Sequence, residues 1–208
     1  QAGSRYIPAP RHEGKYKDAN FERRKNVIQS FELVDSQTVI GQTIYRKRSK
    51  EIEAQFGTML DHFTSYKTIR DRAEMLLPVD EGLGRILQTL EALKILDNTF
   101  ILFTSDNGYF YGEHGLSLER RLPYEESVKT PLLIRYPPLI KQNMRINDFV
   151  LSIDYAPTVL MLGGTPIGKQ IQGQSIIPLL QGNNDNWRKS FLMEYYSYEN
   201  PMPWLIDT

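Results

Sequence analysis

Residues 99–108 decide the fold, and they read Thr-Phe-Ile-Leu-Phe-Thr-Ser-Asp-Asn-Gly. The first six form a continuous run of apolar and β-branched residues, which is typical of a strand buried on both faces in a sheet covered by helices. The last four are polar or conformationally free. In open α/β sheets, ligands bind at the carboxyl ends of strands. The stretch therefore predicts a buried strand that ends in a candidate ligand-binding loop.

Helical and strand patterns alternate on both sides of this strand. Before it, apolar residues recur at helical spacing and predict an amphipathic helix facing a core: Leu83, Ile86, Leu87, Leu90 and Leu93. After it, residues 131–136 predict a second strand, residues 154–162 a short helix ended by Gly163-Gly164, and residues 191–196 a further strand. This rhythm predicts an α/β fold with a mostly parallel sheet flanked by helices. We expect one domain over residues 1–208, in which 1–63 are less characteristic and 64–208 carry the core strands, the helices and the metal loop.

Composition removes several classes of function. Lys and Arg together number 25, as do Asp and Glu, so no basic excess points to a nucleic-acid partner. The longest apolar stretches are too short to cross a bilayer, and no signal peptide is visible. The chain has no cysteine and three histidines, which excludes disulfides and thiolate metal sites and argues against a multi-histidine zinc site.

Asp106 and Asn107 are the candidate metal ligands. They offer a carboxylate and an amide oxygen side by side at a strand end, and Gly108 lets the backbone turn. Oxygen ligands of this kind suit a hard divalent cation such as calcium or magnesium. Asp-Asn-Gly is also a common turn sequence, so the tripeptide alone leaves both interpretations open.

The wider context resembles the sulfatase family of the alkaline phosphatase superfamily. Four elements follow the strand in the family's order: Asp106-Asn107-Gly108, Gly112-Glu113-His114-Gly115, Tyr124-Glu125-Glu126-Ser127 and the Pro131–Pro137 strand. Three more segments resemble family elements: Pro8–His12, Asp80–Arg85 and Asp154–Thr158. The resemblance covers nearly the whole chain and implies part of an alkaline-phosphatase-like layered fold.

The resemblance implies a sulfuric ester hydrolase with a calcium cofactor held by Asp106 and Asn107. It implies two catalytic candidates, His114, which either donates to an ester oxygen or supports the loop, and Arg120. Arg120 stands nearest to the position where many members have a sulfate-binding lysine, and an arginine can hold a sulfate through two hydrogen bonds. The expected substrate is a sulfate ester, such as a sulfated glycan or an aryl sulfate. A periplasmic, secreted or lysosomal location is a family expectation only.

The nucleophile of the family is not among these residues. Sulfatases use a Cys or Ser in Cys/Ser-x-Pro-x-Arg that becomes formylglycine, and this motif is absent from the 208 residues. We therefore expect this chain alone to be inactive and the nucleophile to be supplied by an N-terminal part.

Two rival functions remain open. One is a phosphatase or phosphonate hydrolase of the same superfamily, against which Asn107 argues, because many of those have Asp-His at this point. The other is a non-catalytic relative that serves binding or structure, which Arg120 favours. Gly163–Lys169 imitates a phosphate-binding loop, but Gln170 replaces the required Ser or Thr and the segment follows a helix.

Overall fold

The computed structural model describes residues 6–22, 65–113, 123–196 and 201–207. The chain divides into two compact units. Unit 1 takes its described residues from Gln1–Lys94 and Thr104–Leu132, and unit 2 takes its described residues from Ile95–Phe103 and Leu133–Thr208. None of the described helices has the length and apolar character needed to cross a membrane.

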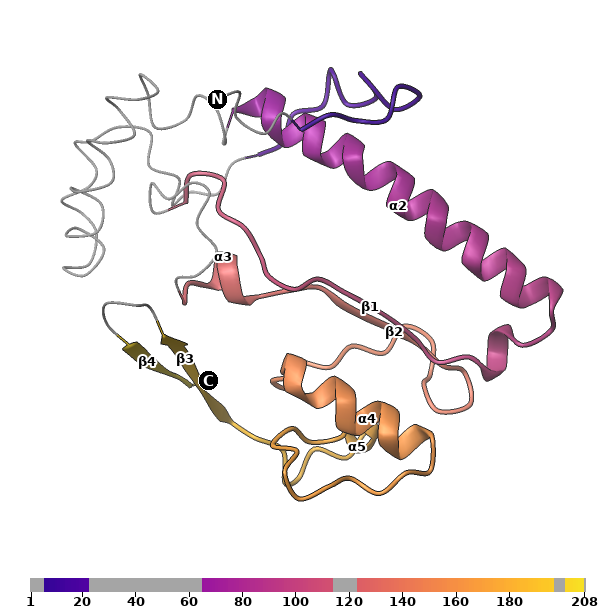
Figure 1. Cartoon of the computed structure of the whole chain (residues 1–208), viewed down its shortest axis with the longest axis vertical. Coiled ribbons are helices and arrows are strands. Elements are labelled where there is room, and N and C mark those ends of the chain that lie inside the picture. The colour runs from indigo at the N-terminus through magenta and orange to yellow at the C-terminus, as the bar shows by residue number, and fades with distance from the viewer. Residues whose placement is uncertain (1–5, 23–64, 114–122, 197–200, 208) are drawn as a thin grey trace. The chain divides into compact units, whose positions relative to one another are not determined.

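Unit 1 is built on the long helix α2, Tyr66–Ala92 (Figure 1). Ser65 caps its start, because the serine hydroxyl accepts a 3.1 Å hydrogen bond from the Thr68 amide. Pro78 lies inside the helix. The sequence predicted that its second half faces a core, but Ile86 is 56% exposed, and the buried positions of α2 are Thr68 and Glu74 in the first half.

Residues 6–22 contain no helix or strand and fold as turns against the first half of α2. The buried carboxylate of Glu74 accepts hydrogen bonds from the amides of Gly14 at 3.0 Å and Tyr16 at 2.8 Å. Arg70 donates to the Ala19 carbonyl at 3.0 Å. Further along the helix, Glu81 pairs with Arg11. Side chains of α2 thus satisfy backbone groups that the irregular segment cannot pair internally.

Strands β1, Ile101–Thr104, and β2, Leu132–Arg135, form a two-stranded sheet (Figure 1). Both strands were predicted, and both are confirmed. Burial on both faces is not seen, because Phe103 is 37% exposed. A short 3-10 helix, η2, Leu96–Asn98, precedes β1, and Arg135 binds it by donating to the Leu96 carbonyl at 2.9 Å.

The core of unit 2 forms where α5, Ile177–Leu180, and the segment after it meet the sheet. Its buried members are Ile176, Leu179, Leu180 and Trp187, against which Phe100, Ile134, Leu139, Ile140, Ile146 and Val150 pack. The predicted helix after β2 is confirmed as η3, Ser152–Asp154, followed by α4, Tyr155–Leu162. Gly163 caps α4, as expected. Gly173 packs directly on this turn, since a Cβ there would lie 1.9 Å from the Ile153 carbonyl oxygen.

The last described elements are strands β3, Ser190–Tyr196, and β4, Pro201–Asp207. They pair antiparallel, with Ser190 opposite Asp207 and Tyr196 opposite Pro201. The strand expected at residues 191–196 is confirmed, but its antiparallel partner was not predicted. The mostly parallel sheet expected from the sequence stays a prediction.

Candidate metal and ester site

The candidate ligands lie in the loop that leaves β1. The side chains of Asp106 and Asn107 are exposed, and one carboxylate oxygen of Asp106 accepts a 2.8 Å hydrogen bond from the Asn107 amide. The Ser105 hydroxyl lies 3.2 Å from the Asn107 carbonyl, to which it donates. These local bonds fix the turn and leave the second Asp106 oxygen and the Asn107 amide oxygen as potential ligands.

Gly108 anchors the loop to helix α3, Glu125–Val128. Its amide donates to the Ser127 carbonyl at 2.7 Å. A Cβ on Gly108 would lie 2.0 Å from the Glu126 carbonyl oxygen. Only glycine allows this approach, which brings the main chain of the Asp-Asn-Gly element directly against that of the Tyr-Glu-Glu-Ser element.

Phe110 is fully buried and holds the next part of the loop in place. Its ring makes an edge-to-face contact with Tyr124, with centroids 5.8 Å apart. Gly112 follows with a φ of 102°, and the buried Glu113 carboxylate accepts a 2.5 Å hydrogen bond from the Tyr111 amide. The Glu113 carboxylate thus holds the main chain of this part of the loop.

A tyrosine cluster lies on the same segment. The guanidinium carbon of Arg72, on α2, is 3.7 Å from the ring centre of Tyr109, 4.9 Å from that of Tyr111 and 5.0 Å from that of Tyr6. Burial raises the pKa of Tyr109 and of Tyr111 above the ordinary tyrosine value, and Arg72 opposes part of this rise. These phenols are therefore neutral at physiological pH and serve as packing and hydrogen-bonding groups.

The donor set fits a hard cation only in part. Asp106 and Asn107 supply two oxygens, whereas calcium takes six to eight. Among the described residues, no group of three or more His, Cys, Asp or Glu could hold a metal ion, so a calcium ion here would need ligands beyond these two. The other two predicted site residues, His114 and Arg120, lie outside the described residues.

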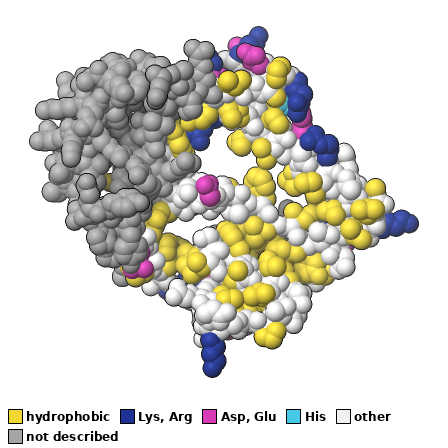
Figure 2. Space-filling model, viewed as in Figure 1, with side chains coloured by type: hydrophobic (Ala, Val, Ile, Leu, Met, Phe, Trp, Pro, Cys, Tyr) yellow, Lys and Arg dark blue, Asp and Glu magenta, His cyan; other side chains and the backbone are white. Residues whose placement is uncertain are grey.

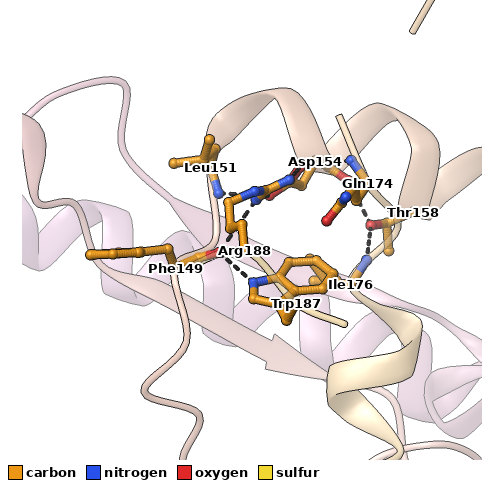
Figure 3. A network of polar contacts seen from close by, with 8 residues as sticks. All are labelled: Phe149, Leu151, Asp154, Thr158, Gln174, Ile176, Trp187 and Arg188. Carbon is orange, nitrogen blue, oxygen red and sulfur yellow. Dashed lines mark hydrogen bonds and ion pairs between the residues drawn. The ribbon is translucent and has the colours of Figure 1, made fainter. Parts of the chain in front are cut away.

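One buried polar network was not predicted from the sequence. Asp154 is fully buried and accepts hydrogen bonds from the amides of Leu151 and Gln174, both at 2.8 Å (Figure 3). The Arg188 guanidinium pairs with both of its oxygens. Thr158 donates to the Asp154 carbonyl at 2.6 Å and accepts from the Ile176 amide at 3.0 Å. Asp154 and Thr158 belong to one of the quoted family elements, but Arg188 carried no signal in the sequence.

Trp187 extends this network toward the core of unit 2. Its indole N–H donates to the Phe149 carbonyl at 2.7 Å, and the Arg188 guanidinium stacks 4.8 Å from its ring centre. The partners of Asp154 among the described residues all belong to unit 2, and together they fix the turn before α4.

Known proteins resemble this chain over most of its length. Residues 112–203 match the family described as "N-sulphoglucosamine sulphohydrolase, C-terminal". An N-acetylglucosamine-6-O-sulfatase from Bacteroides thetaiotaomicron is 39% identical over 145 residues, which cover 68% of this chain and 26% of the relative. The chain spans only 11% to 27% of the length of the curated relatives it matches.

Two solved structures share the fold of this chain. One is a protein in complex with its substrate D-glucosamine-2-N,6-O-disulfate; it superimposes with a TM-score of 0.73 at 25% identity over 99% of this chain and 53% of that one. The other is a phosphonate monoester hydrolase from Silicibacter pomeroyi, with a TM-score of 0.70 at 25% identity over 90% of this chain and 37% of that one. The order of its motifs and these similarities show that the chain belongs to the sulfatase family.

Proposed function

We propose that this chain is part of an enzyme that hydrolyses sulfate esters, with Asp106 and Asn107 among the ligands of a calcium ion. The observation that carries the proposal is the pair of exposed oxygen donors at the end of β1, held rigidly through Gly108 on α3. When bound, a calcium ion offsets the negative charge of the sulfate oxygens.

The described residues have supporting roles in this site. Gly108 and Phe110 fix the main chain that follows the ligands, and Glu113 holds the Tyr111 amide. His114 is proposed to hydrogen-bond an ester oxygen or to support the loop, and Arg120 to bind the sulfate. The nucleophile, a formylglycine in the family, is expected from an N-terminal part of the protein.

A sulfated glycan is the substrate class we favour. A relative is named an N-acetylglucosamine-6-O-sulfatase, and a structural neighbour holds a doubly sulfated glucosamine. A simple aryl sulfate is the less specific alternative, supported by the arylsulfatase of Volvox carteri, which is 30% identical over 188 residues.

The test compares the full-length protein with two single variants. We expect hydrolysis of glucosamine 6-sulfate and of a chromogenic aryl sulfate, stimulated by calcium and abolished by EDTA. Asp106→Ala should lower both the calcium affinity and kcat/KM at least tenfold, whereas Asp97→Ala, at an exposed position in η2, should change neither. Full hydrolysis by the Asp106 variant would remove the proposed metal role.

A phosphonate monoester hydrolase is the second candidate, because a protein with that name shares the fold over 90% of this chain. Assaying a phenyl phosphonate ester beside the sulfates separates the two functions. We expect the sulfate esters to be preferred, since Asn107 supplies a neutral oxygen where a second metal ion needs an imidazole ligand.

A further inference from the structure

Arg72 occupies an unusual environment for a charged side chain. Its guanidinium lies over the faces of three tyrosine rings, and the nearest, Tyr109, is 3.7 Å away. The Nη1 atom is buried and has no hydrogen-bond partner among the described residues. Among the described residues, no carboxylate forms an ion pair with Arg72. The ring faces are therefore its main source of electrostatic stabilisation.

The three tyrosines link separate segments of unit 1. Tyr109 and Tyr111 follow Asn107 by two and four residues, and their rings are 5.4 Å apart. Tyr6 belongs to the irregular N-terminal segment, and its hydroxyl lies 3.4 Å from that of Tyr109. Through one guanidinium, α2 thus contacts the segment that carries the candidate metal ligands.

The loop has a second anchor that does not depend on Arg72. Gly108 binds α3 through its main chain, directly before Tyr109. The α3 anchor fixes where the loop turns, and the tyrosine cluster fixes the direction in which the chain leaves that turn.

We propose that Arg72 is a positioning residue, which holds the Asp106–Asn107 loop in place through Tyr109 and Tyr111. Its importance for metal binding rests on the proposed function, but its effect on the loop does not. Arg72 touches neither candidate ligand, so it acts only by restricting their main chain.

The first experiment is hydrogen exchange by mass spectrometry on the full-length protein, with Arg72→Met, Arg72→Lys and the control Arg85→Met. Arg85 is an exposed arginine on the same helix. For Arg72→Met we expect exchange of residues 105–113 to become faster by roughly 2- to 30-fold, the range for loss of a cation–π contact. Arg72→Lys keeps a cation over the rings and should restore part of the protection. Arg85→Met should leave these amides unchanged.

Two results of the exchange experiment would contradict the role of Arg72. Unchanged exchange at residues 105–113 in Arg72→Met overturns the proposal, as does an equal increase in Arg85→Met. If Arg72→Met unfolds the whole protein, the test rests on Arg72→Lys instead. The proposal then stands only if exchange in Arg72→Lys becomes faster at residues 105–113 and nowhere else.

A calcium titration of the same variants tests the functional consequence. We expect Arg72→Met to weaken calcium binding roughly 2- to 30-fold, with partial rescue in Arg72→Lys. If Asp106→Ala leaves calcium affinity unchanged, the proposed metal site fails, while the exchange result still decides the role of Arg72. If Asp106→Ala abolishes binding and Arg72→Met binds calcium normally, only the inference about Arg72 is refuted.

Discussion

At the scale of single residues, Gly108 is a position near the candidate site that has no space for a side chain. Its contact with the Glu126 carbonyl leaves no room for a side chain. The hydrogen bond from its amide to Ser127 fixes the loop in that position. A substitution must therefore move either the loop or α3.

We expect Gly108→Ala to lower the free energy of unfolding by about 1–3 kcal/mol, the usual cost of overpacking. Calcium binding should weaken as well, since the displaced residues include Asn107. Urea unfolding and calorimetric titration of the full-length protein measure the two effects.

Gly84→Ala is the matched control. Gly84 lies inside α2, and a Cβ there meets no atom within 4 Å. Alanine should stabilise the helix by about 0.5–1 kcal/mol. If Gly108→Ala behaved like Gly84→Ala, the close approach of loop and α3 would be refuted.

A second prediction at this scale concerns the buried pair of Asp154 and Arg188. We expect Asp154→Asn to destabilise unit 2 by about 3–5 kcal/mol, because the Arg188 side chain is only 14% exposed and would lose its counter-ion among the described residues. Asp97→Asn removes the partner of Arg135 at a position where the aspartate side chain is 79% exposed, and should cost about 0–1 kcal/mol. Denaturant unfolding that gave equal losses for the two variants would contradict the structural role of the buried pair.

At the scale of elements, α2 supports the irregular N-terminal segment through carboxylates spaced along one side. Glu74 is buried and binds two main-chain amides, whereas Glu81 is partly exposed, pairs with Arg11 and lies beside His12. The Glu81 Oε1 atom lies 2.9 Å from the His12 Nε2 atom. Besides their own main-chain hydrogen bonds, the turns of residues 10–18 are thus held to α2 by these carboxylates.

The pairing with Arg11 makes this contact sensitive to acid. The hydrogen bond from Arg11 is the largest influence on Glu81 and lowers its pKa below the ordinary 4.5. A carboxyl group with a depressed pKa in the folded state contributes stability above its unfolded pKa, and this contribution is lost as the pH falls through the folded pKa.

We therefore expect hydrogen exchange of residues 9–19 to accelerate as the pH falls below 4.5, once intrinsic exchange rates are divided out. Glu81→Gln should show the faster exchange already at neutral pH and little further change in acid. Glu91→Gln, at an exposed position near the end of the same helix, should behave as the wild type. A pH response that survived in Glu81→Gln would assign the effect to another group.

At the scale of the whole molecule, much of the apolar surface of the described residues is exposed. On α2, Leu76 is 64% exposed, and in unit 2 Leu133 is 65% exposed. Figure 2 shows yellow apolar side chains over the part of unit 2 where Figure 1 places β1, β2 and α4. Exposed apolar area of this kind is typical of surfaces that pack against further protein.

We expect the isolated 208-residue chain to bind the dye ANS strongly, to self-associate, and to show no hydrolysis of an aryl sulfate. The full-length protein should bind little ANS and be active. Fluorescence titration, light scattering and the sulfatase assay check the three expectations. A monomeric isolated chain without ANS binding would show that its apolar side chains are covered in solution.

The sequence was informative where local chemistry determines local structure. The sequence predicted the positions of β1, β2, β3 and α4. Continuous apolar and β-branched runs indicate strands, and paired prolines or glycines end an element, within a few residues of chain. The exit of the Asp106 loop from β1 followed from the same pattern. The assignment to the sulfatase family came from the order of several short elements along the chain.

Long-range features were not predictable in this way. The stripe Leu83–Leu93 has helical spacing, but spacing does not say what covers a helix, and Ile86 is exposed. The pairing of Arg72 with Tyr109 and that of Asp154 with Arg188 join residues more than thirty positions apart. His114 and Arg120 lie outside the described residues, so their roles stay predictions.

The packing of Gly173 against the Ile153 carbonyl restricts which sequences this fold can accept. A library randomised at codon 173 and sorted for folded protein should retain almost only glycine codons. Every other amino acid brings a Cβ into a position that is already occupied. Codon 163 provides the contrast, because a Cβ there would lie 3.5 Å from its nearest neighbour, and many replacements should survive the same sorting. The turn before α4 therefore accepts few substitutions at position 173, although it lies outside the loop that carries the candidate metal ligands.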